Sequence, residues 1–89
     1  MGPVAIELKR RIEAALAPTR LELVDESALH AGHGGHNPAG ESHFRAVVWT
    51  PAFEAMTRVE RTRAVLSAAG DLVSEARVHA LSVEAKPPF

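Results

Sequence analysis

The chain has five histidines and no cysteine, so any metal chemistry is expected to use histidine side chains. Three histidines follow one another at intervals of three residues in a glycine-rich stretch, namely His30, His33 and His36. His43 follows shortly afterwards, and His79 lies alone in an apolar run near the C-terminus. Neutral imidazole is the commonest metal ligand in proteins. Any zinc or iron–sulfur site must therefore use histidine or take its thiolates from a partner.

The glycine-rich histidine stretch has two interpretations. Three imidazoles on one loop can converge on a divalent metal ion such as zinc or nickel, without any partner protein. However, Gly32, Gly34 and Gly35 favour a mobile loop over a pre-formed site. The same histidines can also be solvated loop residues with no ligand. A divalent-metal-binding loop that uses His30, His33 and His36 therefore stays open as one function.

Composition limits the classes of protein to which this chain can belong. Its 89 residues suit one domain with a modest core. A net charge of −1 and a pI of about 6.5 argue against a strong sequence-independent grip on nucleic acid. The lack of cysteine excludes disulfides and fits a reducing compartment. No apolar run is long enough for a membrane span, and no signal peptide is expected. We therefore expect a cytoplasmic protein that is monomeric when free.

The first half of the chain is expected to form a helix and two strands. Apolar residues recur at helical spacing after Pro3, and Pro18 ends that helix. Apolar and polar residues then alternate over residues 19–26 and again over 42–50, which predicts two strands. Between them, residues 28–41 are rich in glycine and histidine and are expected to form a flexible loop.

Two helices are predicted before the last strand. Residues 51–56 are expected to form a short turn or helix. Thr57 is followed three positions later by Glu60, a capping box in which each residue can satisfy the other's backbone amide, so a longer helix is expected over 58–73. Gly70 weakens this helix slightly. Its expected apolar stripe consists of Val59, Val65, Leu66, Ala69, Leu72 and Val73.

The remaining element is a strand, which completes the predicted fold. Residues 78–83 are expected to form this third strand, and residues 85–89 a frayed tail. The element order is then α–β–β–α–α–β. Three strands with helices packed on one face make an α+β two-layer domain. We expect residues 1–89 to form a single domain of this class.

Four segments of the chain match, in order and at compatible spacing, segments of one known family. They are Leu23-Val24-Asp25-Glu26-Ser27, Gly40-Glu41-Ser42-His43-Phe44-Arg45-Ala46-Val47-Val48, Arg58-Val59-Glu60-Arg61-Thr62-Arg63 and Val78-His79-Ala80-Leu81. On these segments, which cover nearly the whole chain, the sequence resembles the BolA family. The resemblance implies a fold similar to a type II KH domain, in agreement with the element order predicted above.

The resemblance also implies a partner and a cofactor. Members of the family partner monothiol glutaredoxins and share a [2Fe–2S] cluster, for which the glutaredoxin cysteine and glutathione supply two thiolates. One ligand on the BolA side is the histidine of the Val-His-Ala-Leu segment, here His79. The other lies in the loop between the first two strands and falls on His30, by its Ser-x-x-His spacing from Ser27, or on His33. Extra residues at 31–35, relative to the shorter bacterial form, leave that choice open.

Some bacterial members of the family resemble transcription regulators, so DNA binding is an alternative function. The helix over 58–73 would then contact DNA, with Arg58, Arg61 and Arg63 as the candidate nucleic-acid-binding residues. Glu60 dilutes this positive charge, and the same arginines can equally face a glutaredoxin. The stretch Gly32–Gly35 matches the KH-domain Gly-x-x-Gly loop only by chance, since here it lies between two predicted strands.

Two of the histidines also have structural interpretations. His79 shares strand parity with Leu81 and Val83, so one face of the third strand can bury all three. His43, at the start of the second strand, is expected to be structural, with a ligand role as the minor alternative.

No arrangement of residues indicates catalysis. Asp25 and Glu26 are adjacent on a strand and point to opposite faces, so they do not form a carboxylate pair. The sequence has no Walker loop, no Rossmann fingerprint and no recognisable Ser-His-Asp arrangement. We therefore expect a protein that is not an enzyme and that functions through iron–sulfur cluster handling or iron regulation, with transcription regulation as the alternative.

Overall fold

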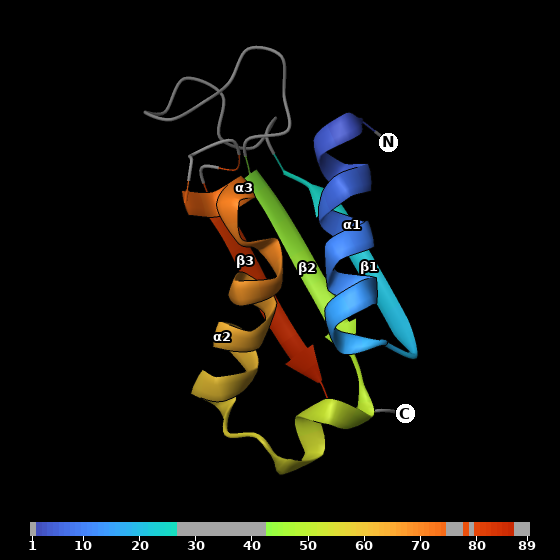
Figure 1. Cartoon of the computed structure of the whole chain (residues 1–89), viewed down its shortest axis with the longest axis vertical. Coiled ribbons are helices and arrows are strands. Elements are labelled where there is room, and N and C mark those ends of the chain that lie inside the picture. The colour runs from blue at the N-terminus through green and yellow to red at the C-terminus, as the bar shows by residue number, and fades with distance from the viewer. Residues whose placement is uncertain (1, 27–42, 75–77, 79, 87–89) are drawn as a thin grey trace.

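Helices α1 and α2 lie on one face of a three-stranded sheet in this computed structural model (Figure 1). The structure describes residues 2–26, 43–74, 78 and 80–86. In chain order its elements are α1 (Pro3–Leu16), β1 (Arg20–Asp25), β2 (His43–Trp49), the 3₁₀ helix η2 (Pro51–Ala55), α2 (Arg58–Ala69), α3 (Asp71–Ser74) and β3 (Ala80–Lys86). The predicted α–β–β–α–α–β order and two-layer α+β class are confirmed.

The central strand of the sheet is β2, which pairs antiparallel with β1 and parallel with β3. Side chains alternate across the sheet as predicted, and one face packs against the helices. The fully buried part of the core includes Phe44, Ala46 and Val48 of β2 together with Leu8 and Ile12 of α1. Within the described residues, no helix is both long and apolar enough to cross a bilayer.

The third strand begins and ends later than predicted. It runs from Ala80 to Lys86, so the assignment of Ala85 and Lys86 to a frayed tail was wrong. Both residues have partners in β2, because the parallel register places Ala85 opposite Val48 and Lys86 opposite Trp49. A local pattern does not contain this register, which depends on the neighbouring strand.

The predicted helix over 58–73 is interrupted at Gly70. This residue has φ 54° and ψ −125°, a conformation that ends α2 at Ala69 and lets α3 begin in a new direction. The prediction that Val59 belongs to the buried stripe was also wrong, since 58% of this residue is exposed. Val59 lies about 120° around α2 from Val65, at about 100° a residue, whereas Ala69 lies only about 40° from Val65 and is buried with it.

The capping box at the start of α2 is confirmed. The Glu60 backbone N–H donates to Thr57 Oγ1 at 3.2 Å, and the Thr57 N–H donates to Glu60 Oε1 at 2.8 Å. The bonds from Thr57 hold the pKa of the Glu60 carboxyl below its usual value. The side chains of Thr57 and Glu60 therefore each accept a backbone N–H that the start of a helix would otherwise leave unpaired.

We expect Thr57→Ala to lower the free energy of unfolding by about 1 kcal/mol, the usual loss for an N-cap. Thr57→Ser keeps the accepting oxygen and should be close to wild type. Urea unfolding followed by circular dichroism measures both. Equal midpoints for the alanine and serine variants would show that the cap does not stabilise this helix.

Candidate functional site

The segment that carries His30, His33 and His36 lies outside the described residues, but the residues on either side of it are joined. Glu26 follows β1, and His43 begins β2. The Glu26 backbone N–H donates to the His43 carbonyl at 2.7 Å. The end of β1 and the start of β2 therefore lie side by side at one end of the sheet (Figure 1).

His79 also lies outside the described residues, and both of its neighbours in sequence are held. Val78 is fully buried, and its backbone N–H donates to the Leu72 carbonyl at 2.8 Å. Ala80 begins β3 opposite His43 in the parallel register. Ala80, which follows His79, and the two residues that flank segment 27–42, Glu26 and His43, therefore lie together at one end of the sheet.

His43 lies where these segments meet and is only 5% exposed. Its carbonyl holds the end of β1, and its backbone pairs with the start of β3. This placement suits the structural role expected from the sequence. In the part of the chain that the structure describes, no group of three or more His, Cys, Asp or Glu residues is arranged to hold a metal ion. The candidate ligands His30, His33 and His79 are not among the residues that this finding covers.

On the sheet face opposite the helices, Arg45 of β2 lies between the residue after β1 and a residue of β3. Its Nε lies 3.6 Å from Glu26 Oε2, just beyond the end of β1, and its Nη1 lies 3.2 Å from Glu84 Oε1 in β3. The pair with Glu84 is exposed to solvent and adds little stability on its own, and the 3.6 Å contact with Glu26 is too long for a hydrogen bond. Arg45 therefore places a positive charge between two carboxylates, and one of them belongs to Glu26, the residue that precedes segment 27–42.

The structure gives the three candidate nucleic-acid-binding arginines different surroundings. The Arg61 Nε donates to the Met56 carbonyl at 3.1 Å, and its guanidinium lies 5.9 Å from the centroid of the Phe53 ring. This side chain is therefore engaged within the fold. Arg58 and Arg63 lie about 140° apart around α2 at about 100° a residue.

Arg58 lies in a shallow groove between α2 and β3. The other residues that line this groove are Thr62, Val83, Glu84, Ala85 and Lys86. Lys86 lines the same groove, but its ammonium lies 6.0 Å from the centroid of the Trp49 ring. The sequence did not indicate this neighbourhood, because Lys86 was assigned to the tail.

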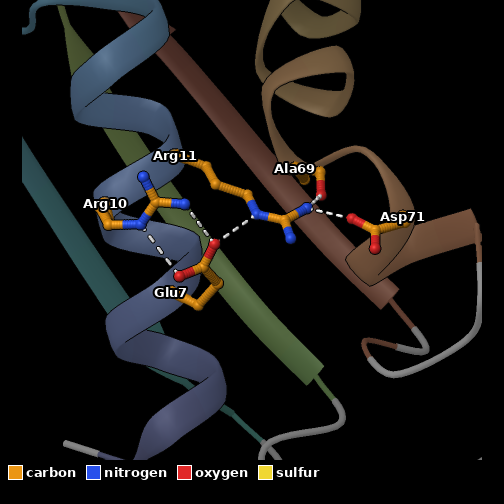
Figure 2. A network of polar contacts seen from close by, with 5 residues as sticks. All are labelled: Glu7, Arg10, Arg11, Ala69 and Asp71. Atoms are coloured by element: carbon orange, nitrogen blue, oxygen red, sulfur yellow. Dashed lines mark hydrogen bonds and ion pairs between the residues drawn. The ribbon is translucent and has the colours of Figure 1, made fainter.

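A polar network on α1 is the feature that the sequence analysis missed. The Arg11 Nε donates to Glu7 Oε2 at 2.8 Å, and its Nη1 donates to the Ala69 carbonyl at 2.9 Å and to the Asp71 carboxylate (Figure 2). Arg10 binds the same Glu7 carboxylate at 3.0 and 2.6 Å. The i,i+3 and i,i+4 spacing predicts the two contacts with Glu7, but no local pattern predicts those with residues 69 and 71.

Acid is expected to weaken this network. Hydrogen bonds from Arg10 and then Arg11 lower the pKa of Glu7 from 4.5 to about 2. Because the folded state binds this proton less readily than the unfolded state, the resulting stability is fully present above about pH 4.5 and is lost as pH falls to about 2.

Denaturant unfolding of wild type and Glu7→Gln between pH 7 and pH 2 measures this loss. The difference in unfolding free energy between the two chains should shrink steadily below pH 4.5. A difference that does not change over this range would show that Glu7 is unpaired in solution.

Comparison with known proteins gives consistent matches along the chain. The sequence model of a family described as BolA-like protein matches residues 12–89. BolA-like protein 1 of mouse is 41% identical over 88 residues, which are 98% of this chain and 60% of that protein. This chain therefore spans less than two thirds of the length of that relative.

Solved structures of similar fold agree with the sequence matches. The BolA domain of SufE1 from Arabidopsis thaliana superposes with a TM-score of 0.86 at 33% identity, covering 99% of this chain and 95% of that one. The solution structure of mouse BolA1 has a TM-score of 0.80 at 40% identity, covering 99% of this chain and 68% of that one.

Proposed function

This chain belongs to the BolA-like family, and from that premise we propose that it partners a monothiol glutaredoxin and shares a [2Fe–2S] cluster with it. The role is in iron–sulfur cluster handling or iron regulation, without catalysis by the chain itself. His79 provides one ligand and a loop histidine, His30 or His33, provides the second. The cysteine of the glutaredoxin and glutathione provide the two thiolates.

The donor set of this chain fits such a shared cluster. The chain has five histidines and no cysteine, so it can contribute imidazoles but no thiolate. Imidazole can replace thiolate at one iron of a [2Fe–2S] centre, which raises the reduction potential. When bound, the cluster supplies redox-active iron and transferable iron and sulfide. A partner that brings two thiolates therefore completes a set that the chain alone cannot provide.

One observation carries the proposal: the described ends of both ligand-bearing segments lie at the same end of the sheet. Glu26 is hydrogen-bonded to His43, and His43 pairs with Ala80, which follows His79 in sequence. A strand of seven residues is about 23 Å long, so histidines attached to opposite ends of β2 would be too far apart to share one cluster. The residues that flank the candidate ligands lie at one end of β2, so this distance does not separate them.

The test mixes the apo chain with a monothiol glutaredoxin that carries its glutathione-ligated cluster. Visible absorption and circular dichroism are followed as the chain is titrated in. The proposal expects a new spectrum that saturates at one chain to one glutaredoxin. Apo glutaredoxin serves as the control, because it should give no visible signal with the chain. A cluster spectrum that stays unchanged at excess chain would refute the proposal, and stoichiometric zinc or nickel uptake by the chain alone would favour the metal-binding loop.

DNA binding is the second candidate function, and the groove between α2 and β3 is the observation that favours it. Arg58 lines this groove, whereas Arg61 is engaged with Met56 and Phe53, and the Lys86 ammonium lies over the Trp49 ring. If DNA phosphates occupy the groove, Arg58→Ala should weaken binding and reduce the slope of log affinity against log salt by about 1. Arg61→Ala should mainly lower stability. A salt titration that finds no DNA binding at physiological ionic strength would exclude this function.

A further inference from the structure

The end of α2 leaves a backbone acceptor that the helix itself does not satisfy. In a continuous helix the Val73 N–H would donate to the Ala69 carbonyl. Here it donates to the Gly70 carbonyl at 3.2 Å. The cause is the positive φ of Gly70, which turns the chain out of the helix. Ala69 is fully buried, so its carbonyl needs another donor.

Arg11 provides that donor from a different helix. Its Nη1 lies 2.9 Å from the Ala69 carbonyl oxygen and also pairs with the Asp71 carboxylate, while its Nε is held by Glu7 (Figure 2). The Arg11 side chain is only 24% exposed. A guanidinium at this point also complements the partial negative charge at the C-terminus of α2. These four residues, Glu7, Arg11, Ala69 and Asp71, form what we call the Arg11 clamp.

A short series of contacts leads from the Arg11 clamp to the residue before His79. Asp71 is the first residue of α3, and the next residue, Leu72, is fully buried. The Leu72 carbonyl accepts the N–H of Val78 at 2.8 Å, and Val78 is itself fully buried. The clamp therefore fixes the α2–α3 junction, and α3 holds the backbone at Val78.

We propose that Arg11 is a positioning residue for the backbone that precedes His79: it holds α3 and, through the Leu72 carbonyl, the backbone of Val78. The ligand role of His79 in this inference rests on the function proposed above. Groups that hydrogen-bond directly to a metal ligand alter metal affinity by about 10–100-fold when they are removed, and a smaller effect is expected of Arg11, which holds the backbone next to the candidate ligand. Loss of the Arg11 clamp should therefore affect cluster sharing although Arg11 is not itself a candidate ligand.

The first test uses the apo chain alone and measures native-state amide hydrogen exchange. The Val78 amide reports on the Leu72–Val78 hydrogen bond, and the Val48 amide reports on the sheet core. Arg11→Ala should increase the exchange rate of Val78 about tenfold more than that of Val48. Arg10→Ala is the matched control, because Arg10 binds the same Glu7 carboxylate but makes no described contact with the α2–α3 junction. It should leave the ratio of the two rates unchanged.

Arg11→Lys adds a partial rescue, since an ammonium group keeps the charge but cannot reproduce the fork of a guanidinium. Its exchange ratio should lie between those of wild type and Arg11→Ala. Equal acceleration of Val78 and Val48 in Arg11→Ala would overturn the inference, because Arg11 would then stabilise the whole domain without positioning this backbone in particular.

The second test repeats the glutaredoxin titration with the same variants. Arg11→Ala should bind cluster-loaded glutaredoxin up to about tenfold more weakly or change its circular dichroism spectrum, while Arg10→Ala should behave as wild type. Wild-type affinity and spectrum in Arg11→Ala would overturn the inference. A wild-type chain that forms no shared cluster would refute the proposed function, and the exchange ratio, which needs neither cluster nor partner, distinguishes that failure from a failure of the Arg11 clamp.

Discussion

Replacing His79 with alanine is expected to abolish the one-to-one spectrum that the chain forms with cluster-loaded glutaredoxin. Groups outside the ligand set already change metal affinity by about 10–100-fold, so loss of a direct ligand should lower the affinity by more than about 100-fold. The chain has no thiolate that could take its place. Titration by visible absorption and circular dichroism measures the loss, and far-ultraviolet circular dichroism checks that the variant is folded.

His79→Cys is the matched control for this prediction. A thiolate can ligate iron at the same position, so the shared cluster should form again. Its reduction potential should be lower than that of the wild-type complex, because imidazole ligation raises the potential of such centres. A His79→Ala chain that keeps the wild-type spectrum would contradict the assignment of His79 as a ligand.

The loop ligand is identified by the same experiment. Either His30→Ala or His33→Ala should reproduce the loss seen with His79→Ala, and the other should not. His36→Ala serves as the control from the same segment. If all three loop variants keep the wild-type spectrum, the second ligand does not come from this segment.

The second large effect is expected at Phe53, where alanine should lower the free energy of unfolding by about 3–5 kcal/mol. Phe53 lies in η2, is fully buried in the core and has the Arg61 guanidinium over its ring. A domain of 89 residues is stable by about 4–13 kcal/mol, so this loss is a large fraction of the total. Urea unfolding measures it through the shift of the midpoint at constant slope.

Val59→Ala is the control for a large apolar residue outside the core. Because Val59 is mostly exposed, its replacement should change stability by no more than about 0.5 kcal/mol. Phe53→Leu, which keeps an apolar side chain in the cavity, should lose less than Phe53→Ala. Similar midpoints for Phe53→Ala and Val59→Ala would contradict the burial of Phe53.

Features that depend on residues close to one another in the sequence could be predicted from the sequence. Alternation of apolar side chains predicts which face of β2 packs against the helices, and Thr57 with Glu60 predicts where α2 begins. Both features arise within a few residues, so the local sequence contains the physical cause. The assignment of Lys86 to a tail was wrong because the end of β3 depends on its register with β2, which is distant in sequence. The assignment of Val59 to the core was a local error, because helical spacing places Val59 about 120° from Val65.

The amino-acid sequence is enough to show that this chain offers imidazoles and no thiolate, and that its elements follow in the order of an α+β two-layer domain. Composition and local periodicity are sufficient for both conclusions. The folded structure was needed to show that Glu26, His43 and Ala80 meet at one end of the sheet, and that Arg11 reaches Asp71, 60 positions away. Strand register and helix packing depend on the whole core, and these long-range contacts follow from them.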